Sequence, residues 1–303
     1  MSKNSKAFLC YIGPMRFLLL VIFSLMFSLS SFALSYKLIK PKNLRPNPTL
    51  ITLLHGCTQT TNAFVGLTHF EKYIEDKNFI LLVPAQSVVR NPAKCWNWYA
   101  VHTALGRSEL QSIKDLVVKY SNEFKVSGSY LYGFSAGSAM GSNLIGLHSE
   151  LFDGVLLHSG YPFHGKGVMN ISDFDLPQEE IYLSAFMGEL TADQQKDLKL
   201  LRTKLNNISP RLKNIVIVSG QKDLIAAHKF SKASYIQFLD DSSFLTYKAF
   251  DGYRVYQAEG KWKTTLYQIP LMGHAWSGGD DNFLFAGSEF VDVTQESFDL
   301  FGL

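Results

Sequence analysis

The sequence predicts an α/β fold built on a mainly parallel sheet with helices on both faces. From Thr49 onward, short runs of β-branched and aromatic residues alternate with longer stretches whose apolar residues recur at helical spacing, an order typical of βαβ units. Several predicted strands are apolar at every position, as strands are when helices cover both faces of a parallel sheet. Of the 303 residues, 47% are hydrophobic and 18% are charged, which excludes a disordered chain.

The apolar runs predict individual strands and helices. The predicted strands are Leu50 to Gly56, Phe79 to Ala85, Ser129 to Phe134, Gly154 to Gly160, Asn214 to Gly220 and Thr265 to Leu271. Helical spacing predicts helices over Ser108 to Phe124, Ser138 to His148 and Leu190 to Leu205. No repeat or low-complexity linker interrupts the chain, so we expect residues 34–303 to form one domain. The strand-poor stretch from Tyr161 to Pro210 (residues 161–210) is expected to be a cap.

The first 33 residues have the pattern of a secretory signal peptide. A mainly apolar stretch of 13 residues, Phe17 to Leu29, follows Arg16, and the small residues Ser31 and Ala33 suit a cleavage site after Ala33. A membrane anchor is the less favoured alternative, because a helix of this length spans only about 20 Å of the roughly 30 Å of hydrocarbon. We expect a protein that is secreted or periplasmic, with no membrane contact after cleavage.

The charge balance gives no reason to expect a nucleic-acid partner. The formal net charge is +3, from 29 basic and 26 acidic residues. Cleavage after Ala33 removes Lys3, Lys6 and Arg16 and no acid, which leaves 26 residues of each sign. No basic tract remains that would bind nucleic acid.

Two of the three cysteines, Cys57 and Cys95, lie in the expected mature chain. In an oxidising compartment they can pair and close a loop of 38 residues (95 minus 57). Such a bridge is worth about 3–4 kcal/mol in the chain-entropy model. The alternative is two buried thiols.

The strongest chemical signal is the pentapeptide Gly133-Phe134-Ser135-Ala136-Gly137, which lies between a predicted strand and a predicted helix. It predicts a nucleophile elbow, in which a serine occupies a tight, strained turn and glycines two residues to either side leave room for it. The following helix would direct the Ala136 amide toward the point where an oxyanion develops in acyl transfer. A turn of small residues without chemistry is the alternative.

A carboxylate and a base follow Ser135 in the chain order that α/β-hydrolases use. Asp223 comes soon after the strand Asn214 to Gly220, and His274 soon after Thr265 to Leu271. Open parallel sheets gather their sites at the carboxyl ends of strands. We therefore predict an α/β-hydrolase fold in which Ser135 is the nucleophile, His274 the base and Asp223 the orienting acid.

Other readings of these acids and histidines stay open. Asp223 can instead cap a following helix. Asp153 and Asp251 are weaker candidates for the acid, because no long apolar strand is predicted before them. His55 and His158 lie at the ends of predicted strands and are candidates for hydrogen-bonded structural groups near the site.

The loop after the first predicted strand supplies a second amide. Gly56 permits a close backbone approach, so the Cys57 amide can pair with that of Ala136 around a developing negative charge. A disulfide from Cys57 would stiffen this loop. We also predict that the indoles near these loops line a substrate pocket, with a purely structural role as the alternative. They are Trp96, Trp98 and Trp276.

The sequence lacks the common metal and nucleotide motifs. It contains no HExxH, no CxxC pair, no GxGxxG opening a helix after the first strand and no GxxxxGK[ST]. Neither a metal nor another cofactor is therefore expected. Cys57 is a weak rival nucleophile, since a paired sulfur cannot attack.

Five motifs together resemble the secreted poly(3-hydroxybutyrate) depolymerase family of esterases, which includes feruloyl and acetylxylan esterases. They are LLHGCTQT (53–60), CWNWY (95–99), GFSAGSAM (133–140), HSGYP (158–162) and GHAWSGG (273–279). The resemblance implies the roles given above to Ser135, Asp223, His274 and the Cys57 amide. It also implies a disulfide between Cys57 and Cys95.

The chain departs from the family pattern at two places. Ser138 stands where glycine or alanine is usual, and SGQKD (219–223) stands where HGxxD is more common. The resemblance implies hydrolysis of short hydroxyacyl or aryl esters, on small or oligomeric substrates. Insoluble polymer is less expected, because the chain ends soon after GHAWSGG. The alternatives are a non-catalytic binding protein and a long-chain lipase with Tyr161 to Pro210 as its lid.

Overall fold

The computed structural model describes residues 34–163, 208–239 and 244–303. The chain divides into two units, Met1–Leu34 and Ser35–Leu303, and the second unit contains the elements described below. The predicted signal peptide, residues 1–33, lies outside the described residues. So do residues 164–207, which include most of the predicted cap and the predicted helix Leu190 to Leu205.

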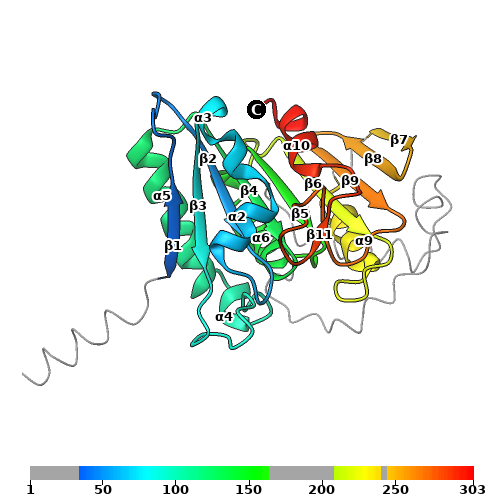
Figure 1. The fold of residues 1–303 in the computed structure, drawn as a ribbon, viewed down its shortest axis with the longest axis horizontal. Coiled ribbons are helices and arrows are strands. Elements are labelled where there is room, and N and C mark those ends of the chain that lie inside the picture. Colours follow the sequence, from blue (N-terminus) through cyan, green and yellow to red (C-terminus); the bar gives the residue numbers. More distant parts are fainter. Residues whose placement is uncertain (1–33, 164–207, 240–243) are drawn as a thin grey trace, which may run out of the picture. The chain divides into compact units, whose positions relative to one another are not determined.

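A nine-stranded sheet forms the centre of this unit (Figure 1). Its strand order is β1-β3-β2-β4-β5-β6-β9-β8-β7. The bounds are β1 Ser35–Ile39, β2 Thr49–Leu54, β3 Phe79–Ala85, β4 Gly128–Phe134, β5 Gly154–His158, β6 Asn214–Gly220, β7 Phe244–Phe250, β8 Tyr253–Glu259 and β9 Lys263–Ile269. The six strands from β3 to β9 in this order pair in parallel, and β1, β8 and β7 pair antiparallel. The prediction of a mainly parallel α/β sheet is confirmed.

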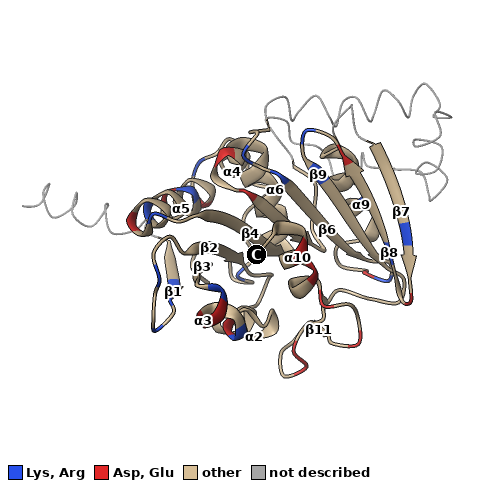
Figure 2. Cartoon of the chain, turned by 90° about the horizontal axis from the view of Figure 1, so that it is seen from above, with Lys and Arg blue, Asp and Glu red and all other residues tan. Residues whose placement is uncertain are grey.

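Helices cover both faces of the sheet. Seen from above, α2, α3 and α10 lie on one side and α5, α6 and α9 on the other (Figure 2). The helices are α2 Thr61–Leu67, α3 Ile74–Lys77, α4 Val101–Ala104, α5 Glu109–Phe124, α6 Ala136–His148, α9 His228–Gln237 and α10 Val293–Phe301, with 3₁₀ turns η1 Phe70–Tyr73 and η2 Ser149–Leu151. A short pair of strands, β10 Trp276–Ser277 and β11 Ala286–Gly287, follows β9. The central strands β4, β5 and β6 contain no Lys, Arg, Asp or Glu.

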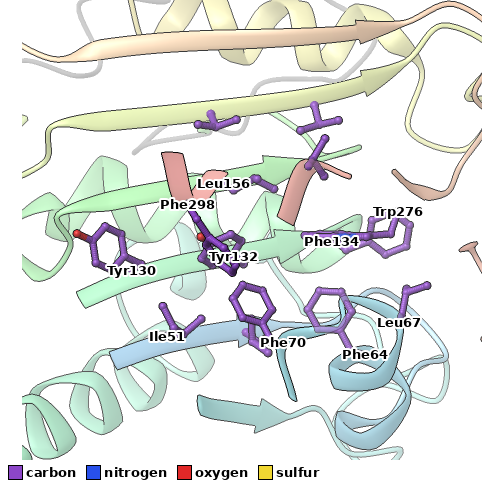
Figure 3. Packing of buried hydrophobic residues seen from close by; sticks show 14 of the residues in the cluster. Ile51, Phe64, Leu67, Phe70, Tyr130, Tyr132, Phe134, Leu156, Trp276 and Phe298 are labelled. Carbon is purple, nitrogen blue, oxygen red and sulfur yellow. The ribbon is translucent and has the colours of Figure 1, made fainter. Parts of the chain in front are cut away.

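Aromatic side chains fill the core between the sheet and the helices α2 and α10 (Figure 3). The ring of Phe70 meets Tyr132 of β4 edge to face, with centroids 4.7 Å apart, and packs on Phe298 of α10 at 5.9 Å. Phe64 of α2 packs edge-on against Trp276. Full burial of such side chains contributes about 1.5–3 kcal/mol each, so this cluster fixes how α2 and α10 lie on the sheet.

Strand ends follow local backbone chemistry. The bounds predicted for β3 and β6 are those observed. The predicted strand to Gly160 ends earlier, at His158, because Ser159 takes the left-handed backbone with φ 49°. The predicted strand to Leu271 ends at Ile269, because Pro270 has no amide hydrogen for a ladder.

The hairpin of β7 and β8 was missed by sequence reasoning. Its residues are mostly exposed or half-buried, so they form no apolar run. Asp251 lies in the turn of this hairpin and follows β7, a strand that is exposed rather than apolar, in keeping with the expectation that no long apolar strand precedes it. No helix in the described ranges has the length and apolar character needed to cross a membrane.

One buried hydrogen bond joins the sheet to α10 and gives an asymmetric prediction. The Ser297 hydroxyl donates to Thr294 O at 2.6 Å, so the Tyr132 hydroxyl is the donor in their 2.8 Å contact. Ser297→Ala leaves the buried Tyr132 hydroxyl without an acceptor and should cost about 1–3 kcal/mol. Tyr132→Phe leaves Ser297 bonded and should cost about 1 kcal/mol. Urea unfolding measures both, and an equal or reversed order would contradict this account.

Candidate active site

Ser135 stands on a strained turn between β4 and α6. Its backbone takes φ 55° and ψ −119°, a conformation that residues other than glycine rarely adopt. A Cβ on Gly133 would come within 2.6 Å of Gly137 O, and one on Gly137 would collide with the Leu54 carbonyl of β2. The Ser135 amide donates to His158 O of β5 at 2.9 Å. The two glycines and the neighbouring strands therefore hold the turn in place.

Three side chains from separate loops lie in hydrogen-bonding succession at this turn. His274 Nε2 lies 3.0 Å from Ser135 Oγ, and His274 Nδ1 lies 2.8 Å from Asp223 Oδ2. The Asp223 and His274 side chains are 1% and 8% exposed, and Ser135 is 9% exposed. With a proton on Nδ1 donated to Asp223, His274 Nε2 is free to accept the Ser135 hydroxyl proton.

The two carboxylate oxygens of Asp223 have different partners. Oδ2 faces His274, while Oδ1 accepts the amides of Ile225 at 2.9 Å and Ala226 at 2.8 Å. Burial by itself raises the pKa of Asp223, but the contacts with His274 and with the two amides outweigh it, so the pKa lies below its ordinary value. The capping reading and the contact with His274 thus coexist on separate oxygens, and the cap serves a turn rather than a helix.

Among the described residues, two backbone amides in the loops next to the Ser135 turn have no acceptor. A Cβ on Gly56 would lie 3.2 Å from Ser135 Cβ, so the loop after β2 runs beside the nucleophile turn. Gln59 Oε1 accepts the Gly56 amide at 2.8 Å and holds this loop. Within the described residues, the amides of Cys57 and Ala136 donate no hydrogen bond. The oxyanion role expected for these two amides therefore stays a prediction that the hydrogen-bond pattern leaves open to them.

A disulfide ties the same loop to the segment after β3. Cys57 and Cys95 are bonded, with their Cα atoms 4.2 Å apart. The Thr58 amide also donates to Ala93 O at 2.7 Å. Covalent and hydrogen bonds thus join the two loops side by side.

His158 lies fully buried behind the site. Its ring packs on Trp276, with centroids 5.0 Å apart, and its Nε2 accepts the Ser277 amide at 3.0 Å. Nδ1 therefore carries the proton and donates to Ser159 Oγ at 3.1 Å. Burial, together with the neighbouring His274, lowers the pKa of His158 to about 3. His158 is a neutral group that joins β5 to the loop carrying His274.

Two of the three tryptophans predicted to line a pocket are core residues. Trp96 and Trp276 have no exposed surface. Their indole N–H groups donate to His55 O at 3.0 Å and to Thr294 Oγ1 at 3.1 Å. The pocket prediction is therefore wrong for these two, because both rings point inward from their loops.

Trp98 belongs to an aromatic stack beside the Asp223 loop. Its ring stacks on Tyr161 with centroids 4.7 Å apart, and Tyr161 packs on Phe230 at 4.6 Å. The Tyr161 hydroxyl donates to Ile225 O at 3.2 Å. Sequence reasoning missed Tyr161 and Gln59, although both lie inside the motifs HSGYP and LLHGCTQT. In the part of the chain that the structure describes, no group of three or more His, Cys, Asp or Glu could hold a metal ion.

The chain has the α/β-hydrolase fold, which it shares with solved esterases. An acetyl xylan esterase from Aspergillus awamori superposes with a TM-score of 0.66 at 15% identity, over 89% of this chain and 94% of that one. A carboxylesterase from Bacillus cereus superposes with a TM-score of 0.51 at 13% identity, over 91% and 97%. At such identities the likeness establishes the fold alone.

The sequence match is more specific. Residues 34–181 match the model of the family described as Esterase PHB depolymerase. Over that part the chain is similar to the PHB depolymerase esterases, which confirms the resemblance seen in the motifs.

Three curated relatives match this chain over about two fifths of its length. Poly(3-hydroxyalkanoate) depolymerase C from Paucimonas lemoignei is 30% identical over 133 residues, 41% of this chain and 30% of the relative. Acetylxylan esterase A from Emericella nidulans is 28% identical over 126 residues, 40% of each chain. Feruloyl esterase B from Thermothelomyces thermophilus is 29% identical over 130 residues, 41% of this chain and 43% of the relative. The match therefore spans less than half the length of each relative.

Two neutral histidines, the buried His158 and the half-buried His228, predict how the free energy of unfolding depends on pH. Burial, reinforced by Lys232, lowers the pKa of His228 to about 3, and that of His158 is also about 3. Between pH 6.5 and 3 the unfolded chain binds protons that the folded chain does not. Stability is therefore fully present above about pH 6.5 and falls as the pH drops through this window, by up to about 1.4 kcal/mol per pH unit for each group.

His228→Gln should reduce the slope of the free energy of unfolding against pH, because it removes the contribution of one of the two histidines. The measurement is the free energy of unfolding in urea at intervals from pH 7 to pH 4.5. His102→Gln, at an exposed position, is the matched control and should keep the original slope. Equal slopes for the native chain and His228→Gln would contradict the account.

Proposed function

We propose that this protein is an exported serine esterase that hydrolyses short hydroxyacyl or aryl carboxylic esters through an acyl-enzyme. The observation that carries the proposal is the succession Asp223, His274 and Ser135, with distances of 2.8 and 3.0 Å. It is supported by two amides, of Cys57 and Ala136, that have no acceptor in the part of the chain that the structure describes. A nucleophile, a base, an orienting acid and an oxyanion site are the groups that acyl transfer requires. A non-catalytic binding protein would have no need for this combination.

In the proposed reaction, Ser135 Oγ attacks the ester carbonyl carbon while its proton passes to His274 Nε2. The carbonyl oxygen becomes an oxyanion and accepts hydrogen bonds from the Cys57 and Ala136 amides. The Asp223 carboxylate stabilises the imidazolium that forms. Collapse of the tetrahedral intermediate releases the alcohol, which takes the proton from His274. Water then repeats the sequence and frees the acid and Ser135.

The proposed substrates follow from the relatives and from the walls of the site. The named relatives are an acetylxylan esterase, a feruloyl esterase and a poly(3-hydroxyalkanoate) depolymerase. The substrates in all three names are carboxylic esters. Trp98, in its stack with Tyr161, remains our candidate for a pocket wall. Rigid aromatic rings give apolar contact at small entropic cost, which suits a short hydroxyacyl or aryl group.

The proposed organisation is a signal peptide, residues 1–33, followed by one catalytic domain, residues 34–303, with a cap within 161–210. Export to a periplasm or out of the cell is supported by the disulfide of Cys57 with Cys95, since such bonds persist in oxidising compartments. The long-chain lipase remains the alternative that a substrate panel separates.

Ser135→Ala should abolish turnover of p-nitrophenyl acetate and butyrate, with kcat falling by at least about 10³-fold, since it removes the attacking oxygen. His274→Asn should fall to a similar level, and Asp223→Asn somewhat less. Ser112→Ala, on the outer part of α5, is the matched control. A fluorophosphonate probe should label the native chain and not Ser135→Ala. Equal rates for native chain and Ser135→Ala would end the proposal, and a strong preference for the palmitate ester would favour the lipase.

The disulfide should contribute to rate as well as to stability. The double variant Cys57→Ser, Cys95→Ser should lose about 3–4 kcal/mol of stability, from the 38-residue loop. At a temperature where the variant stays folded, we expect kcat to fall about tenfold with little change in KM, because the Cys57 amide loses its fixed position. Unfolding in urea and steady-state kinetics measure the two effects. An unchanged kcat beside lowered stability would assign the bridge to stability alone.

A further inference from the structure

A carboxylate that the proposed mechanism does not use lies buried behind the oxyanion loop. Glu109, the first residue of α5, is 2% exposed. Its Oε1 accepts Gln86 Nε2 at 2.6 Å and Asn97 Nδ2 at 2.7 Å, and its Oε2 accepts the Asn97 amide at 2.9 Å. Within the described residues it forms no ion pair with a basic side chain. The helix N-terminus favours the negative charge, and the three neutral donors replace its water.

Gln86 connects this carboxylate to the loops around Cys57. Its Nε2 also donates to Cys95 O at 3.1 Å, and its Oε1 accepts the Ser87 amide at 3.0 Å. Both amide hydrogens and the amide oxygen of the side chain are thus used, which fixes its orientation. The backbone amide of Gln86 then donates to His55 Nε2 at 3.1 Å.

His55 in turn orients the peptide between Gly56 and Cys57, whose N–H is the candidate oxyanion donor. Because Nε2 accepts a hydrogen bond, the ring proton lies on Nδ1, which donates to Gly56 O at 2.7 Å. Burial lowers the pKa of His55, against the hydrogen bond to Gly56, so the ring stays neutral. The chain has no cis peptide bond in the described ranges, and the Cys57 N–H therefore points opposite to the Gly56 carbonyl that His55 holds.

A second route leads from the same carboxylate to the same residue. Glu109 holds both the amide and the side chain of Asn97, and Gln86 holds the carbonyl of Cys95. Cys95 is in turn bonded to Cys57. Glu109 and Gln86 are therefore the common origin of the two links that fix Cys57, one through the peptide plane and one through the disulfide.

We propose that Glu109 is a positioning residue for the oxyanion amide of Cys57, acting through Gln86 and His55 and through the segment from Cys95 to Asn97. This inference rests on the proposed esterase function. It assigns to Glu109 no contact with substrate. Its effect is on the energy of the oxyanion, which forms only during the reaction, and therefore on kcat rather than on KM.

The test is Glu109→Gln compared with Glu123→Gln, the same substitution at an exposed position of the same helix. Glu109→Gln removes one acceptor and turns an NH₂ group toward an N–H donor. Titration of Ser135 with a fluorophosphonate first counts the competent sites. Per titrated site, we expect kcat to fall about tenfold with KM within about twofold of the native value. Ki for a trifluoromethyl ketone, whose adduct carries an oxyanion, should rise about tenfold.

A residue that merely supports folding would lower the number of titrated sites and leave kcat per site and Ki unchanged. That result overturns the inference, as does a loss in Glu123→Gln equal to that in Glu109→Gln. If Glu109→Gln does not fold, Gln86→Met removes the side-chain bonds of Gln86 to Glu109, Cys95 and Ser87 and is judged by the same criteria. Because the Gln86 side chain is bonded to Glu109 and takes part in the links to Cys57, the two single losses should overlap in the double variant rather than multiply. Losses that multiply would overturn the route.

A failure of the proposed function is visible before any of these variants is compared. In that case the native chain neither turns over the p-nitrophenyl esters nor reacts with the fluorophosphonate, and the inference falls with it. If the native chain is active and Glu109→Gln has the same kcat per titrated site and the same Ki, the inference is overturned while the proposed function stands.

Discussion

The parallel pairing of β2, β4, β5, β6 and β9 is the constraint on which the candidate site depends. In this register Leu54 lies opposite Gly133, and Phe134 lies opposite His158, so the loops that leave these strands begin at one edge of the sheet. The Ser135 turn is possible only because the neighbouring backbone accepts it: the Leu54 carbonyl leaves no space for a side chain at Gly137. The strain at φ 55° is therefore maintained by the packed sheet rather than by the turn itself.

The surroundings of the three histidines at this site give them two different roles: two are neutral hydrogen-bond acceptors and one faces a carboxylate. His55 and His158 each accept a backbone amide at Nε2, which requires a neutral ring. Burial lowers the pKa of both, so the apolar surroundings that would penalise a charged ring also preserve its acceptor. His274 differs because its Nδ1 faces the Asp223 carboxylate. Only that ring has an anion placed to stabilise a transferred proton.

The sequence predicts the parts of this structure whose signals are local. The strands β3 and β6 are apolar throughout because both faces are buried, whereas the exposed hairpin of β7 and β8 carries no such signal. Ser135 is apparent from its glycines. The direction of the Trp96 and Trp276 rings is not local, because it depends on what packs against them. Glu109 lies far along the chain from Cys57, so only the folded structure reveals their connection.

The loop that carries Cys57, whose amide is the proposed oxyanion donor, is held by two kinds of bond that constrain different quantities. A disulfide fixes the separation of Cys57 and Cys95, but it leaves the peptide plane between Gly56 and Cys57 able to rotate about its flanking dihedral angles. The hydrogen bond from His55 to Gly56 O fixes that rotation, yet alone it would not keep the loop at a set distance from Ser135. An oxyanion donor needs both distance and direction. The convergence of both links on Gln86 and Glu109 explains why a carboxylate that cannot touch a substrate is kept buried and fully hydrogen-bonded at this place.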